Sequence, residues 1–163
     1  MNRFIQTVVI CVVIASLSLI GGCSDDDPVN LPSTGSVAGK VTFQGTWPIT
    51  GDVQVSIFSG LTTPFIPMGP PDGVTDPIQS GVTTFDYNIS GLDFGTYTVI
   101  YVGWRDPLDP ANARLLGMYW TMTDSVGIGA LGDPVDTPTP VTISSGMLNH
   151  SNLDIKADLD LAP

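Results

Sequence analysis

Residues 91–104 read Gly-Leu-Asp-Phe-Gly-Thr-Tyr-Thr-Val-Ile-Tyr-Val-Gly-Trp, and this stretch decides the fold. From Thr96 to Trp104 it is apolar at successive positions, which is typical of a central strand covered on both faces. Gly95 permits a turn just before that strand. We therefore expect Tyr97 to be buried at the strand entry, with its hydroxyl group bonded to nearby backbone.

The flanking segments alternate between apolar and polar residues with a period of two. Clear alternation covers residues 37–43, 53–57, 83–89 and 153–159, and shorter strands are expected at 116–122 and 141–143. All 16 acidic residues are aspartate, and with 18 glycines and 14 prolines the composition suits strands and turns rather than helices. The sequence predicts an all-β domain over residues 35–163, an antiparallel β-sandwich of about seven strands.

The N-terminus has the pattern of a secretory signal. Arg3 supplies a positive start, residues 4–20 are uncharged and mostly apolar, and Gly21-Gly22 precede Cys23. A cysteine in this place resembles the lipobox of bacterial lipoproteins. That resemblance implies a signal peptide over 1–22, a Cys23 acylated with palmitate-like chains, and a flexible tether over 23–34.

Two other interpretations of the N-terminus are weaker. A retained transmembrane helix needs about 20 apolar residues, and this run is shorter and diluted by polar residues and glycines. A signal peptide cut elsewhere would leave Cys23 as a free thiol or remove it. In similar lipoproteins an aspartate directly after the cysteine tends to mean inner-membrane retention. The serine at position 24 therefore favours a lipid anchor in the outer membrane, if the organism has one.

The remaining chain of about 140 residues is long enough for one domain with a real core. Four basic residues, Lys40, Arg105, Arg114 and Lys156, face 16 acids, so its net charge is about −12. This acidity argues against a nucleic-acid partner. With Cys23 acylated, no disulfide is available, and the core alone must hold the domain together.

Residues 91–99 resemble the "L-x-x-G-x-Y-x-V" strand entry of carboxypeptidase regulatory-like domains. Residues 36–41 and 53–57 are similar to the first two strands of that family, and residues 140–146 with 153–155 to its closing pair. The match spans about 35–160 and implies a transthyretin-like sandwich. Asp93-x-Gly95-x-Tyr97 is also similar to the immunoglobulin tyrosine corner. The immunoglobulin pattern would have a cysteine at Val99, so the transthyretin-like alternative is preferred.

Catalytic groups are scarce. His150 is the only histidine, no serine lies in a nucleophile elbow, and no Cys/His cluster suits a metal. We expect no cofactor and no enzymatic activity. A small hydrolase that uses paired aspartates stays open as the second alternative, although no spacing singles out two of them.

Several aspartates gather between Trp104 and Pro140, and they are candidate ligands for calcium. Calcium favours clustered carboxylates, and Asp106, Asp109, Asp133 and Asp136 are the candidates, with Asp124 nearby. Prolines follow Asp106 and Asp109 directly, which is ordinary turn chemistry. We therefore expect each of these carboxylates to cap its own turn, and calcium binding remains an alternative.

Two long connections, Gly60–Gly81 and Arg105–Pro140, are the expected places for function. Trp47 and Trp104 are candidate binding aromatics, and Trp47, which precedes a proline, is expected to be the more exposed. The sequence favours a membrane-anchored, extracytoplasmic module with a non-enzymatic binding or structural role. Its partner would be an envelope protein or a glycan, and the alternative is carbohydrate- or calcium-dependent binding.

Overall fold

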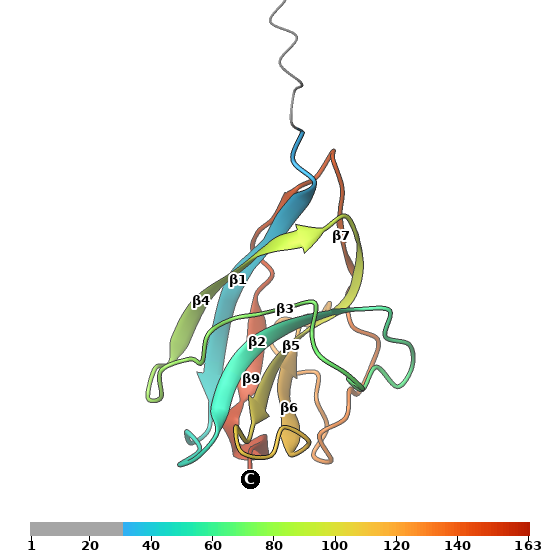
Figure 1. Cartoon of the computed structure of the whole chain (residues 1–163). Coiled ribbons are helices and arrows are strands. Elements are labelled where there is room, and N and C mark those ends of the chain that lie inside the picture. The colour runs from blue at the N-terminus through green and yellow to red at the C-terminus, as the bar shows by residue number, and fades with distance from the viewer. Residues whose placement is uncertain (1–30) are drawn as a thin grey trace, which may run out of the picture. The chain divides into compact units, whose positions relative to one another are not determined.

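The computed structural model describes residues 31–163, which form two packed β-sheets (Figure 1). The expected signal peptide over 1–22, Cys23 and most of the expected tether lie outside the described residues. Within that part of the chain the elements are β1 (Thr34–Gln44), β2 (Asp52–Ser59), β3 (Gly73–Val74), β4 (Thr84–Asp93), β5 (Gly95–Arg105), β6 (Ala113–Met118), β7 (Val141–Ile143), β8 (Asn149–His150), β9 (Ile155–Asp158) and a 3-10 turn η1 (Leu159–Leu161).

The strands divide into a four-stranded and a five-stranded sheet. In the first, the order is β4-β1-β8, and β9 also pairs with β1. In the second, the order is β3-β2-β5-β6, and β7 also pairs with β5. The predicted β-sandwich is confirmed, and β5 is its central strand, with Val99 to Val102 all buried.

The pairing is not wholly antiparallel, as the sequence had led us to expect, because β8 and β9 both run parallel to β1. The reason is where the last segment starts. Ile143 of β7 pairs with Gly95, at the beginning of β5, and its side chain also lies beside Gly35 near the beginning of β1. The last segment therefore starts beside the beginning of β1. When it then runs along β1, it runs in the same direction as β1, which makes the pairing parallel.

The strand expected at 116–122 is displaced toward the N-terminus. It begins at Ala113 and ends at Met118. Met118 still pairs with Tyr101 of β5, whereas its N–H group donates to the carbonyl oxygen of Val126 in the following loop at 3.0 Å. The strand therefore ends at the residue where this loop begins to pack against the sheet.

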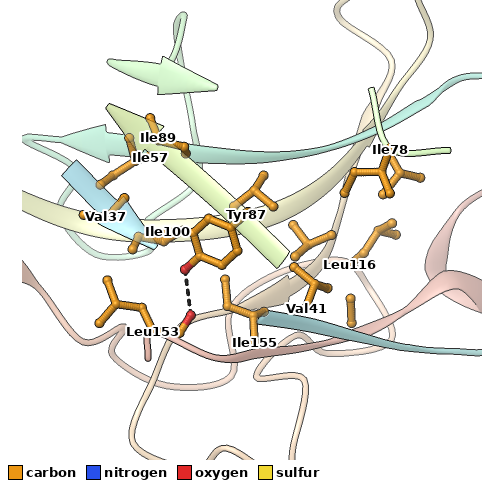
Figure 2. Close-up of a cluster of buried hydrophobic side chains, with 14 of the residues drawn as sticks. Val37, Val41, Ile57, Ile78, Tyr87, Ile89, Ile100, Leu116, Leu153 and Ile155 are labelled. Atoms are coloured by element: carbon orange, nitrogen blue, oxygen red, sulfur yellow. Dashed lines mark hydrogen bonds between the residues drawn. The ribbon is translucent and has the colours of Figure 1, made fainter. Parts of the chain in front are cut away.

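The main core fills the space between the sheets (Figure 2). The hydroxyl group of Tyr87 donates to the carbonyl oxygen of Leu153 at 2.6 Å, which joins β4 to the C-terminal segment inside this core. Burial raises the pKa of the Tyr87 phenol, so it remains a protonated donor. The core residues lie between positions 37 and 159, and Pro32–Pro163 form one compact unit. This unit thus carries its own core, and we expect it to fold alone.

The C-terminal segment packs backbone to backbone on two strands. A Cβ atom at Gly39 of β1 would lie 2.3 Å from the carbonyl oxygen of Leu153, and one at Gly117 of β6 would lie 2.2 Å from that of Lys156. No side chain fits at such distances. These two glycines therefore let the last segment pass close to both β1 and β6.

The entry of β5 is a corner at which the chain changes sheets, since β4 and β5 belong to different sheets and only Phe94 separates them. Tyr97 is 5% exposed, and its hydroxyl donates to the carbonyl oxygen of Asp93 at 2.9 Å. The predicted buried tyrosine is confirmed. The left-handed residue of this corner is Gly91, with φ of 74°, rather than Gly95.

Candidate functional site

A groove of about 820 Å³ lies on the outer face of the five-stranded sheet. Strand alternation creates this groove. Ser56 and Tyr101 are paired and point outward, whereas the residues directly before and after each of them in sequence point into the main core. Residues 67–71, from the β2–β3 loop, form one wall. Pro110 and Ala111, from the β5–β6 loop, form part of another. Both connections that the sequence marks as functional therefore line one groove.

The wall formed by the β2–β3 loop is tied to the sheet. The hydroxyl group of Tyr101 donates to the carbonyl oxygen of Phe65 at 2.7 Å, and burial raises the pKa of that phenol. Phe65 has a φ of 61°, a left-handed conformation that non-glycine residues adopt rarely. Farther along, the Asp72 carboxylate accepts a hydrogen bond from the N–H of Ser59. Two side chains thus hold this loop in place over the sheet.

The rest of the outer face is closed by a different loop. Residues 119–140 cover a second hydrophobic cluster, which consists of Phe58, Val99, Tyr101, Met118, Trp120 and Ile128. The indole N–H of Trp120 donates to the carbonyl oxygen of Ser125 at 3.0 Å, which fixes that loop. Phe58 and Tyr101 belong both to this cluster and to the base of the groove. The groove is therefore the part of the outer face that the loop leaves open.

Two arginines line the groove. Arg105 is the last residue of β5 and Arg114 is the second residue of β6, and the antiparallel register places the end of β5 beside the beginning of β6. Both arginines are exposed. Among residues 31–163, the only ion pair within 4.0 Å joins Lys40 and Asp86, at 3.8 Å. Neither arginine is thus neutralised by a carboxylate, although this part of the chain has 13 aspartates and four basic residues.

The two candidate tryptophans are structural in this fold. Trp47 is half-buried rather than exposed: its ring packs on Phe43 with centroids 5.0 Å apart, and its indole N–H donates to the carbonyl oxygen of Val82 at 3.0 Å. Trp104 borders the groove but is only 3% exposed, and its indole N–H donates to Thr50. Trp104 therefore offers no open ring face on which a sugar could stack, and the ring of Trp47 is held in the fold by Phe43 and Val82.

The calcium candidates do not converge. The carboxylates of Asp106, Asp109 and Asp136 accept from the N–H groups of residues 108, 111 and 137, so each caps its own turn, as expected. Asp133 takes part through its carbonyl oxygen, which accepts from Gly129. Across residues 31–163, no three metal-ligating side chains of the His, Cys, Asp or Glu type come together.

The remaining candidates for chemistry are dispersed. His150 lies at the far end of the fold, with Nε2 2.8 Å from the carbonyl oxygen of Thr142. A hollow of about 240 Å³ beside the β5 entry is bordered by Asp72 and Asp93. Burial, and then these two carboxylates, raise the pKa of Tyr97. A hydrolase with paired aspartates would have to use this hollow, where Asp72 already accepts a backbone hydrogen bond.

Sequence reasoning missed Arg105 and Arg114 as site residues. The available signal was their position, because they flank the connection between two of the expected strands, Thr96–Trp104 and 116–122. Within residues 31–163 no helix has the length and apolar character needed to span a membrane. No protein-family model, curated protein or solved structure matches this chain.

Proposed function

We propose that this protein is a lipid-anchored module of the cell envelope that binds a partner through the groove and performs no catalysis. The observation that carries the proposal is the convergence of the two long loops on one groove with free arginines. Loops held on a rigid sandwich are a common way to build a binding site. The acylated Cys23 and the transthyretin-like family belong to the same proposal and rest on the sequence motifs alone.

The alternatives have less support. Calcium-dependent binding requires carboxylates that converge, whereas the candidate acids cap separate turns. Binding of neutral sugars usually uses an exposed aromatic ring, whereas Trp104 is buried and Trp47 is half-buried, and each donates its indole N–H to a backbone carbonyl oxygen. For the hydrolase alternative, the aspartates that border a common hollow are Asp72 and Asp93, and that hollow has a volume of only about 240 Å³.

The anchor is tested by Cys23→Ser in the full chain. We expect the variant protein to leave the membrane fraction or to accumulate with its signal peptide, because no thiol is available for acylation. Mass spectrometry of the wild-type N-terminus is the direct measurement. An unmodified Cys23 within a longer mature chain would contradict the anchor.

The groove is tested by photo-crosslinking in intact cells. A photoreactive amino acid replaces Met68, which is 91% exposed on the groove wall, or Met147, which is 56% exposed outside the groove. We expect discrete adducts from position 68 and none of the same mass from position 147. Equal adduct patterns from both positions, or adducts from position 147 alone, would contradict binding through the groove.

A further inference from the structure

We propose that the groove binds a soluble aliphatic carboxylate, a ligand with an apolar chain and one anionic end group. This inference rests on the proposed function and specifies the chemistry of the same site. Three features carry it: the apolar character of the accessible lining, the two arginines at one end that have no carboxylate partner within residues 31–163, and the negative charge of the rest of the domain.

The accessible lining is aliphatic rather than aromatic. Phe58 and Tyr101 are nearly covered at the base, whereas Met68 and Val74 are exposed and Leu115 is half-buried. Pro70 and Pro110 add further apolar surface from the two loops. A groove of about 820 Å³ is within the usual range of about 300–1,000 Å³ for small-molecule sites. An alkyl chain would be stabilised here by about 0.8 kcal/mol per buried methylene.

The polar groups select an anion. The side-chain amide of Gln54 already donates to Thr75 at 2.8 Å, and the hydroxyl of Tyr101 donates to Phe65. The guanidinium groups of Arg105 and Arg114 keep most of their donors, since Arg114 makes one recorded bond, to the carbonyl oxygen of Ala113 at 2.9 Å. A guanidinium group matches the two oxygens of a carboxylate in geometry and in charge.

The surrounding charge makes these arginines distinctive. The described part of the chain has 13 aspartates and four basic residues, so its net charge is about −9 and its field repels anions at long range. A small anion without an apolar chain would gain only the contact with the arginines. An anion with an apolar chain would gain that contact and the contact with the apolar lining together. The same repulsion disfavours a second copy of this domain as the occupant.

The source of the ligand follows from the charge of the domain. A net charge of about −9 disfavours close contact between the groove and an anionic lipid surface. We therefore commit to a soluble ligand and not to a membrane lipid.

The test uses residues 32–163, which form one unit with their own core, in isothermal titration calorimetry below the micelle concentration. The probes are decanoate, decyltrimethylammonium with the same chain and the opposite charge, and acetate with the charge and no chain. We expect decanoate to bind at least about tenfold more tightly than the other two, which corresponds to about 1.4 kcal/mol. Comparable affinity for both decyl probes, or no decanoate binding up to about 1 mM, would overturn the proposal.

Matched variants then locate the bound carboxylate. Arg105→Gln and Arg114→Gln should each weaken decanoate binding about fivefold to tenfold. Lys40→Gln removes the same charge outside the groove and should leave the affinity unchanged. Because these side chains are exposed, thermal unfolding should be nearly unchanged, which checks that every variant is folded. Equal losses in all three variants would show a general charge effect and overturn the site.

Failure of this inference is distinguishable from failure of the proposed function. If decanoate does not bind while position 68 still crosslinks in cells, the groove is a binding site for another chemistry. If decanoate binds with the expected charge dependence while position 68 gives no adduct, the carboxylate site stands and a macromolecular partner at the groove does not. A chemical-shift map with decanoate should also centre on Val74 and Leu115 rather than on the main core.

Discussion

Gly39→Ala should destabilise the domain strongly although it adds a single methyl group. A Cβ atom at this position would lie 2.3 Å from the carbonyl oxygen of Leu153, 2.5 Å from its carbonyl carbon and 3.0 Å from its nitrogen. All three are backbone atoms, so no side chain can rotate away. Since an ordinary contact of this kind is about 3.4 Å or longer, the C-terminal segment would have to move by about 1 Å.

The cost follows from the hydrogen bonds that such a movement breaks. The N–H of Leu153 donates to Ala38 at 3.1 Å, and its carbonyl oxygen accepts from Tyr87 at 2.6 Å. Next to it, the Asp154 carboxylate accepts from the N–H of Lys40 at 2.9 Å. At a net value of about 1 kcal/mol for each bond, the loss is about 3 kcal/mol. The lower entropy of an alanine in the unfolded chain returns about 0.4–1 kcal/mol, so the expected net loss is about 2–3 kcal/mol.

The measurement is equilibrium urea unfolding of residues 32–163. Gly146→Ala is the matched control, because a Cβ atom there would meet nothing within 4 Å and its φ is not in the left-handed range. We expect the control to stay within about 0.5 kcal/mol of the wild type. If Gly39→Ala is as stable as Gly146→Ala, the close approach of the C-terminal segment to β1 is wrong.

Three further predictions concern the buried tyrosines. Tyr97→Phe removes the bond to the Asp93 carbonyl and should cost about 1 kcal/mol in urea unfolding; an unchanged midpoint would contradict the corner. Burial raises the phenol pKa of Tyr87, Tyr97 and Tyr101, so above about pH 10 the unfolded chain loses these protons first and the free energy of unfolding should fall; equal stability at pH 9 and pH 11 would refute this. Tyr101→Phe frees the carbonyl of Phe65 and should speed proteolysis within residues 60–72, whereas Tyr97→Phe should not.

Sequence patterns predicted faces of strands better than partners of strands. The alternation over residues 37–43 and 153–159 correctly marks which side chains are buried. The same pattern contains no information on direction, so the parallel pairing of β9 with β1 was not foreseen. The relevant signal was Gly39, which lies on the buried face where a side chain would be expected. A glycine in that place indicates that another backbone passes close by.

The half-buried state of Trp47 has a comparable explanation. A residue before a proline in a turn is usually near solvent, and Trp47 was therefore expected to be the more exposed of the two candidate tryptophans; it is, but only in part. Its ring instead closes the edge of the core beside Phe43, and its indole N–H finds the carbonyl oxygen of Val82, 35 positions away. Only the tertiary fold brings that acceptor to the turn. The local sequence could therefore predict the position of the turn but not the residues on which the Trp47 ring packs.

The groove could be inferred only in part, because its walls come from loops that are distant in sequence. The positive charge at one end of the groove was easier to predict from the sequence. Arg105 and Arg114 flank a proline-containing turn, and an antiparallel pair joined by that turn must bring both to one end. In a domain whose other surface charges are mostly aspartates, two cations at the end of an apolar groove create a local contrast in potential. That contrast, together with the apolar lining, is the physical reason to expect a ligand that is anionic at one end and apolar along the rest.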